Sequence, residues 1–149
     1  MPPNVGITPP LAEEKEITVS ANVESLTAVN EFVADLIAPT NCPMGVQMKI
    51  ELIVEEIFVN IANYAYDDAG GTATVRGVVA GEPPVLTLSF ADEGIPYNPL
   101  SQDAPDLSLS VENRPIGGLV IFIVRKNADD VTYEHKDGKN ILTVAKKLV

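Results

Sequence analysis

The chain has 149 residues, which is enough for one compact domain with its own core but short for two. Hydrophobic residues make up 46% and charged residues 21% of it, as in ordinary globular proteins, and the formal charge of −11 argues against direct binding to nucleic acid or to an anionic membrane. No apolar run approaches the roughly 20 residues of a membrane span, and the first residues lack the basic and then apolar order of a signal peptide, so a cytoplasmic protein is expected.

Turn residues and hydrophobic periodicity predict the elements in chain order. Residues 1–12 are rich in proline and are expected to form a flexible leader, followed by a single domain over residues 13–149. The spacing of apolar residues predicts strand 16–21, helices 25–38 and 44–66, strands 72–79 and 85–90, helix 117–126, and strands 130–135 and 140–145. Residues 92–114 show little periodicity, which is typical of a functional lid or of disorder.

This order of elements predicts the fold class. Two short, turn-rich links join strands 72–79 and 85–90, and strands 130–135 and 140–145, which makes each pair antiparallel neighbours. With helices between the hairpins, an α+β fold is expected: a two-layer α/β sandwich with one mixed, mainly antiparallel sheet and its helices on one face. Such a layout leaves a cleft between the helix layer and the lid.

The second predicted helix carries a polar stripe on an otherwise apolar surface. Glu56, Asn60, Asn63 and Asp67 stand at i, i+4, i+7 and i+11, within an arc of roughly 60° at about 100° per residue. A carboxylate and two amides on such a helix are costly to bury unless they meet partners or a ligand. The stripe is therefore either the wall of a polar pocket or the solvated side of an amphipathic helix, and the segment alone does not decide between them.

Two glycine-containing segments further along could meet this stripe at the cleft. Asp92 ends a predicted strand, where its carboxylate could accept a hydrogen bond from a ligand amine while Gly94 lets the ligand approach the backbone. Gly117 and Gly118 precede a predicted helix whose exposed N–H groups would attract phosphate, with Arg114 placed to help. Each segment alone also fits an ordinary turn or loop. Their order after the stripe, with a long segment between them, is more specific.

The single Cys42 and the single His135 are not candidates for chemistry. One cysteine cannot form an internal disulfide, which fits a reducing compartment. The two residues lie far apart in the sequence and share no recognisable spacing, so neither a Cys–His nucleophile pair nor a zinc site is expected.

The three motifs resemble those of the GHKL ATPases, the superfamily of gyrase, heat-shock chaperones, histidine kinases and mismatch-repair ATPases. Glu56-x-x-x-Asn60 followed by Asn63 resembles the N box, Asp92-x-Gly94-x-Pro96 the G1 box, and Gly117-Gly118-Leu119 the G2 box. Within the superfamily the chain is most similar to bacterial anti-sigma-factor serine/threonine kinases, on its short length and on residues 92–99, 114–119 and 133–140. The likeness runs from about Glu16 to Leu148 and implies a Bergerat fold with ATP under the lid.

The resemblance also implies a role for the residues of the first two motifs. Asn60 would hold the Mg²⁺ that bridges the phosphates of ATP, and Glu56 would act as general base on a serine or threonine hydroxyl of a partner. Asp92 would take the adenine amino group, and Gly94 would line the base pocket. Phosphoryl transfer mainly needs a metal, positioning and charge neutralisation, which agrees with an amide and a carboxylate on adjacent helical turns.

The remaining ATP-binding residues follow from the same resemblance. The N–H groups of Gly117, Gly118 and Leu119 would hold phosphate, with Arg114 beside them. Asn63 would shape the edge of the ATP pocket. Asn140 is not assigned as a site residue, although it could reach the adenine through water.

Two positions depart from the family pattern. Tyr64 stands where a histidine is usual, and Val120 stands where the G2 box usually has another glycine. A β-branched side chain at Val120 could crowd the phosphate-binding backbone and reduce nucleotide affinity or turnover. This departure keeps open a non-catalytic module that regulates a partner by binding alone.

The resemblance implies an ATP-dependent protein serine/threonine kinase with protein partners. The expected partners are a small anti-anti-sigma (STAS-type) protein as the substrate and a sigma factor that the protein sequesters, with a homodimer as the expected assembly. A detached ATPase domain of a histidine kinase fits less well. The sequence shows no dimerising phospho-acceptor helix, and His135 falls in the last predicted hairpin.

Overall fold

The computed structural model describes residues 13–101 and 118–149, with the backbone alone at Ser101, Gly118 and Leu119. The predicted leader, residues 1–12, lies outside the described residues, and so does the predicted lid from residue 102 onward. The helices are α1 (Leu26–Ile37), α2 (Met44–Tyr64) and α3 (Gly118–Asn127). The strands are β1 (Lys15–Ser20), β2 (Thr72–Ala80), β3 (Val85–Asp92), β4 (Asp130–Lys136) and β5 (Lys139–Lys147).

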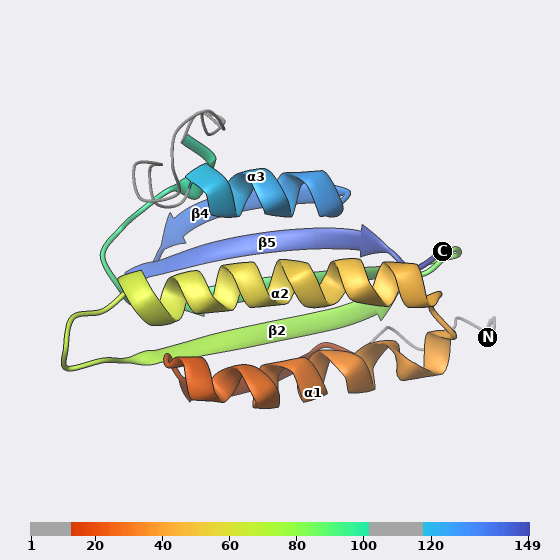
Figure 1. The fold of residues 1–149 in the computed structure, drawn as a ribbon, viewed down its shortest axis with the longest axis horizontal. Helices are drawn as coiled ribbons and strands as arrows, with labels where there is room; N and C mark the ends of the chain where they lie inside the picture. Colours follow the sequence, from red (N-terminus) through yellow and green to blue (C-terminus); the bar gives the residue numbers. More distant parts are fainter. Residues whose placement is uncertain (1–12, 102–117) are drawn as a thin grey trace, which may run out of the picture.

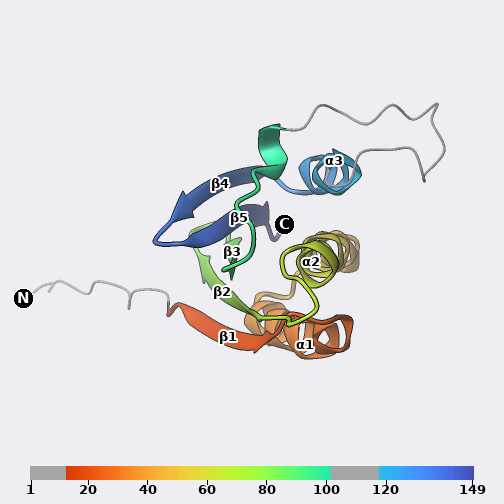
Figure 2. The ribbon, with the colours of Figure 1, turned by 90° about the vertical axis from the view of Figure 1, so that its left-hand side faces the viewer.

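The five strands form one sheet in the order β1-β2-β3-β5-β4, and the three helices cover one face of it (Figures 1 and 2). The predicted α+β fold, a two-layer sandwich with helices on one face, is confirmed. Every pairing among the described strands is antiparallel, so the sheet is more regular than the mixed one expected. The reason is that β5 lies between β3 and β4, which run in the same direction and would otherwise pair in parallel.

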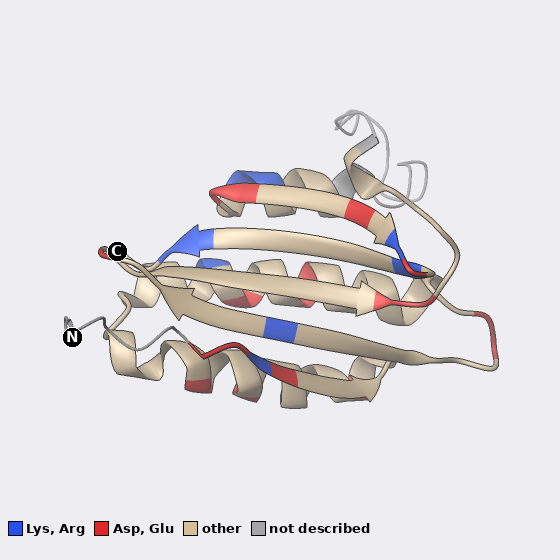
Figure 3. Cartoon of the chain, turned by 180° about the vertical axis from the view of Figure 1, so that it is seen from behind, with Lys and Arg blue, Asp and Glu red and all other residues tan. Residues whose placement is uncertain are grey.

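The core lies between the sheet and α2, which crosses the middle of the helix layer (Figure 1). Alternate residues of the strands point inward, as the period of two in a strand requires. The buried residues of α2 recur at helical spacing: Ile50, Ile53, Val54, Ile57, Phe58 and Ile61. They pack with alternate residues of the central strands: Ala73, Val75, Leu86, Leu88, Phe90, Leu142 and Val144. Seen from behind (Figure 3), β3 and β5 carry charged residues only towards their ends.

Helix α2 ends two residues earlier than predicted, and this changes the polar stripe. The carbonyl of Ala65 accepts a hydrogen bond from Ile95 N at 3.1 Å. The Tyr66 hydroxyl donates to Thr72 O at 2.6 Å and accepts from Glu93 N at 2.7 Å. These tertiary contacts hold the chain in a turn after Tyr64, so Asp67 lies outside the helix. The prediction that Asp67 extends the stripe is therefore wrong.

The predicted hairpin of the last two strands is confirmed. Asp137 and Gly138 connect β4 to β5 with φ of 54° and 77°, the positive values that a tight two-residue hairpin requires.

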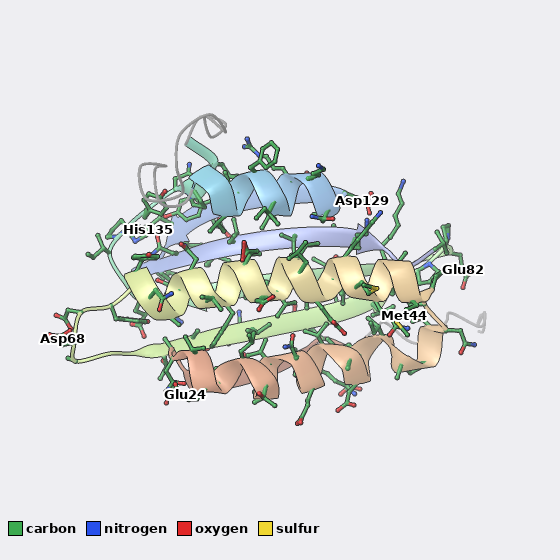
Figure 4. All side chains as sticks on the ribbon, in the orientation of Figure 1. Glu24, Met44, Asp68, Glu82, Asp129 and His135 are labelled. Atoms are coloured by element: carbon green, nitrogen blue, oxygen red, sulfur yellow. The ribbon has the colours of Figure 1, made fainter. Side chains whose placement is uncertain are left out.

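Cys42 and His135 do not form a common site. His135 lies near the end of β4, and Met44, two residues after Cys42, lies at the opposite end of the molecule (Figure 4). None of the helices in the described part of the chain has the length and apolar character needed to cross a membrane.

Candidate functional site

A cavity of about 300 Å³ opens between α2, α3 and one end of the sheet. Three side chains bring amide or carboxylate groups to it: Asn60 of α2, Asp92 at the end of β3 and Asn140 near the start of β5. The rest of the lining is mainly apolar and comes from all the surrounding elements, including Ile57, Ile61, Ile95, Val120, Ile121, Tyr133 and Leu142. A mainly apolar pocket with a few convergent polar groups is typical of a small-molecule site.

Asp92 is one of two buried polar residues in the described chain, with 7% of its surface exposed. Its Oδ1 accepts hydrogen bonds from Gly94 N at 2.9 Å and from Asn140 Nδ2 at 3.0 Å. No described residue donates to the other carboxylate oxygen, Oδ2. Because Asp92 lines the cavity, Oδ2 can accept a hydrogen bond from a ligand.

Gly94 is required by a close approach of two backbone segments. A Cβ at this position would lie 2.1 Å from the carbonyl oxygen of Ala65, at the end of α2. The same carbonyl accepts the hydrogen bond from Ile95 N. The close approach that Gly94 permits in the described chain is therefore to α2, and it holds the segment after β3 against the cavity.

Asn60 lines the cavity and carries a polar atom without a partner in the described part of the chain. Its Oδ1 is buried and has no hydrogen-bond partner among the described residues. A buried polar atom without a partner costs about 1–3 kcal/mol, and native structures contain few of them. Such an orphaned acceptor at a cavity wall indicates a ligand group or a cation that would pair with it.

The amide oxygen of Asn60 is a suitable ligand for a magnesium ion that is bound together with a nucleotide. An amide oxygen is a hard ligand of the kind that Mg²⁺ prefers. Among the described residues, no group of three or more His, Cys, Asp or Glu side chains could hold a metal without further help. Mg²⁺ commonly takes few protein ligands and completes its shell with substrate phosphates and water, which suits a single amide oxygen.

The other two stripe residues within α2, Glu56 and Asn63, lie off the cavity. Glu56 is half-buried, one helical turn before Asn60, and does not line it. Burial raises the pKa of the Glu56 carboxyl, and the neighbouring charge of Glu55 raises it further. Asn63 is exposed and does not line the cavity either. The stripe therefore divides: Asn60 lines the cavity together with Asp92, Glu56 lies one helical turn earlier on α2, and Asn63 is exposed.

The start of α3 forms part of the same wall. Gly118 and Leu119 are its first two residues, and Val120 and Ile121 line the cavity directly after them. The first N–H groups of a helix have no partner within it, so this end can receive an anion. Arg114 and Gly117, the other two predicted phosphate-binding residues, lie outside the described residues.

A family model described as the histidine kinase-like ATPase domain matches residues 19–146, from β1 to β5. The chain belongs to this family. The resemblance to the GHKL ATPases, drawn from the three motifs, is thereby confirmed. Membership of the histidine kinase-like ATPase domain family implies ATP binding.

The relatives of this histidine kinase-like ATPase domain carry one recurring name. The serine-protein kinase RsbW of Bacillus cereus (strain AH187) is 26% identical over 135 residues, covering 87% of this chain and 82% of the relative. The serine-protein kinase RsbW of Bacillus anthracis (strain A0248) is 30% identical over 98 residues, covering 62% of this chain and 59% of the relative.

A solved structure has the same fold. It contains the RsbU and RsbW domains of Rv1364c from Mycobacterium tuberculosis, with a TM-score of 0.64 and 17% sequence identity. The match covers 91% of this chain and 32% of the solved one, so the present chain spans about a third of that protein.

One residue of the cavity wall had no role assigned from the sequence. Asn140 is buried and donates a hydrogen bond to Asp92 across the pairing of β3 with β5, in which the two residues stand opposite each other. The last predicted strand contains Asn140, but its pairing partner and register cannot be read from its own residues. Only the sheet order of this histidine kinase-like ATPase domain shows the contact.

Substitution of Gly94 by alanine is expected to destabilise the protein by about 1–3 kcal/mol, as overpacking of closely packed atoms does. The added Cβ would collide with backbone, which cannot rotate away as the tip of a side chain can. Urea unfolding measures the loss. Gly45→Ala is the control, since a Cβ there meets nothing within 4 Å and alanine favours the helix. Equal stability of Gly94→Ala and the wild type would contradict the close approach.

Proposed function

We propose that residues 13–149 form one ATP-binding domain that acts as a protein serine/threonine kinase of the anti-sigma-factor type. The observation that carries the proposal is the pairing, in one cavity, of a buried carboxylate that has an unused oxygen with an orphaned amide oxygen. The relatives named serine-protein kinase support the choice of acceptor. Transfer of radiolabelled γ-phosphate from ATP to a serine or threonine of an acceptor protein tests it, and no transfer by the wild type would overturn it.

The adenine is proposed to bind at Asp92. The unused Oδ2 is an acceptor and suits the exocyclic amine of adenine, because a carboxylate accepts hydrogen bonds and does not donate them. Side chains such as Ile95, Ile121 and Leu142 supply the apolar surface that a flat heterocycle needs. Gly94 would line this pocket through the segment that it holds against α2.

The phosphates are proposed to lie between Asn60 and the start of α3. Asn60 Oδ1 would be a ligand of Mg²⁺, which when bound would neutralise phosphate charge. The N–H groups of Gly118 and Leu119 would hold phosphate at the positive end of the helix. Gly117 and Arg114, from outside the described residues, are proposed to join them.

Glu56 is proposed as the general base. Its carboxylate would take the proton of the acceptor hydroxyl as that oxygen bonds to the γ-phosphorus, while the bond from the γ-phosphorus to the bridging oxygen breaks and releases ADP. Its raised pKa suits a base, because a weakly acidic carboxyl holds a proton better once it has taken one. Asn63 is exposed, so its proposed role is limited to the edge of the pocket.

The acceptor is proposed to be a small anti-anti-sigma (STAS-type) protein, with a sigma factor as the second partner and a homodimer as the working assembly. An exposed apolar row on α2 supports a protein acceptor. Met44, Met48 and Leu52 are exposed and stand four residues apart, and the next position in this row is Glu56. Exposed large apolar side chains that gather in this way are typical of protein-binding surfaces.

The rate of transfer is expected to fall on acidification through the raised pKa of Glu56. The base works only when ionised, so the acid limb of kcat/KM should lie above the ordinary value of 4.5. Glu55→Gln removes the like charge that contributes to the shift and should move this limb to lower pH. A pH profile of both proteins measures it. If the acid limb of kcat/KM lay at the same pH in Glu55→Gln as in the wild type, Glu56 would not be the group whose titration causes it.

The alternative function, a non-catalytic nucleotide-binding module, is favoured by Val120. This half-buried side chain lines the cavity in the first turn of α3, where the family pattern has a glycine. If it crowds the phosphates, Val120→Gly should tighten binding of ATP with Mg²⁺. Calorimetry of both proteins, with and without Mg²⁺, measures this crowding. Tight binding of Mg-ATP by the wild type would remove the argument from Val120 for the alternative.

A further inference from the structure

Among the described side chains that line the cavity, Asn140 takes part in the most hydrogen bonds. Only 8% of its surface is exposed. Its Nδ2 donates to Asp92 Oδ1 at 3.0 Å and to Ile95 O at 3.0 Å, with a longer contact of 3.4 Å to Gly94 O. Its Oδ1 accepts from Tyr97 N at 3.1 Å and from the hydroxyl of Tyr133. One amide therefore joins β4, β5, the end of β3 and the segment that follows it.

These contacts exhaust what an asparagine can do. The side-chain amide has two N–H donors and two acceptor lone pairs on its oxygen. Asp92 and Ile95 take the donors, while Tyr97 N and the Tyr133 hydroxyl take the acceptor sites. Asn140 lines the cavity and yet has no hydrogen-bonding capacity left for a ligand, directly or through water. Asn140 can therefore affect ligand binding only by positioning the groups to which it is hydrogen-bonded.

The most consequential of these groups is Asp92. Both of its donors, Gly94 N and Asn140 Nδ2, reach the same oxygen, Oδ1. This fixes the rotation of the carboxylate and leaves Oδ2 as the oxygen available to a ligand. An adenine presents an amine at the relevant position and can donate to Oδ2, whereas a guanine presents a carbonyl oxygen that a carboxylate repels.

We propose that Asn140, itself held by Tyr133, is a positioning residue that sets the preference of the cavity for adenine over guanine by orienting Asp92 and tethering residues 94–97. The proposal rests on the proposed function, because it needs a nucleotide in the cavity. Besides orienting Asp92, Asn140 holds the backbone of residues 94–97 in place. Ile95 and Tyr97 line the cavity, and Asn140 binds the backbone of both. Loss of the amide would free the carboxylate and the wall beside it together.

Nucleotide binding tests the selectivity. Affinities for ATP and GTP are measured by calorimetry, in the presence of Mg²⁺, for the wild type, Asn140→Ala and Tyr133→Phe. Asn140→Ala is expected to lose about tenfold or more in ATP affinity, since each tenfold step corresponds to about 1.4 kcal/mol and two well-placed hydrogen bonds act on Asp92 and the tether. Its affinity for GTP should change less, so the ratio falls. An unchanged ratio in Asn140→Ala would overturn the proposal.

Tyr133→Phe keeps the ring and removes one hydroxyl, so it tests the same device if Asn140→Ala does not fold. It should shift the ratio in the same direction by a smaller factor. The matched control is Thr132→Ala, an exposed side chain on the same strand that points to the other face. An ATP-to-GTP ratio in Tyr133→Phe equal to that of the wild type, with Asn140→Ala unfolded, would also overturn the proposal.

Amide hydrogen exchange of the nucleotide-free protein separates positioning from the proposed function. Asn140→Ala should accelerate exchange at Gly94 and Tyr97, while amides of β2 such as that of Val75 keep their protection. Acceleration spread evenly over the sheet would show a merely structural role and overturn the positioning. A wild type that binds neither nucleotide would overturn the proposed function and the selectivity with it, whereas the exchange result tests the tether in either case.

Discussion

Glu56→Gln is expected to reduce phosphate transfer by a factor of about 10²–10⁴ while ATP binding stays within about twofold of the wild type. Glutamine keeps the size and polarity of the side chain but cannot take the proton of the acceptor hydroxyl. Glu56 does not line the cavity, so its charge contributes little to holding the nucleotide. Single-turnover transfer from radiolabelled ATP, together with calorimetric binding of ATP, measures the two effects separately.

The same variant should be at least as stable as the wild type at neutral pH. Burial raises the pKa of Glu56 in the folded state above its unfolded value. The folded protein then binds more protons than the unfolded chain between the two values, so this group favours folding at low pH and loses that contribution as the pH rises through the folded pKa. Glutamine removes the cost of the buried charge. A higher melting temperature at neutral pH, and a smaller difference in acid, would show that lost transfer is not lost folding.

Glu55→Gln is the matched control for both measurements. It makes the same chemical change at the neighbouring position, where the side chain is exposed. Transfer at neutral pH should stay close to that of the wild type, because Glu55 acts on Glu56 only through its charge. Full transfer by Glu56→Gln, or an equal loss in Glu55→Gln, would exclude Glu56 as the base.

Asn60→Leu is expected to abolish Mg²⁺-dependent ATP binding and yet to raise the free energy of unfolding by about 1 kcal/mol. Leucine has the branching and nearly the shape of asparagine, and it replaces a buried oxygen that no described residue satisfies. A substitution that removes an orphaned acceptor relieves its desolvation cost. The opposite signs are the signature of a residue retained for a ligand at the expense of stability.

Urea unfolding in the absence of nucleotide and calorimetry with ATP, each with and without Mg²⁺, measure these two effects. Asn30→Leu makes the same change on α1, away from the cavity, and should alter the unfolding free energy by less than about 0.5 kcal/mol and leave ATP binding unchanged. If Asn60→Leu destabilised the protein as much as the substitution of a hydrogen-bonded buried polar residue usually does, Oδ1 would have a partner in the protein. Binding of Mg-ATP by Asn60→Leu at wild-type affinity would remove Asn60 from the metal site.

Local pattern in the sequence determined much of this protein. The period of apolar residues predicted every α-helix and strand found in residues 13–101 and 118–149, and the turn residues predicted both hairpins there, because side-chain periodicity and turn chemistry are properties of short segments. The order of the three motifs was enough to identify the GHKL superfamily, which the family match confirms. Asn60 and Asp92, far apart in the chain, were both assigned to one site, and both line one cavity.

What only the tertiary structure decided concerns where each polar group finds its partner. Periodicity marked Asn63 and Asp67 as continuations of the Asn60 stripe, but the helix ends at Tyr64 because Ile95 and Glu93, from beyond β3, bond to the residues after it. The sequence around Asn140 does not show that every donor and acceptor of its side-chain amide is already used in a hydrogen bond within the protein. Its partner Asp92 lies 48 residues away, and strand order alone brings them together. Helical and strand periods encode which face is buried, whereas hydrogen-bond saturation depends on distant groups meeting in space.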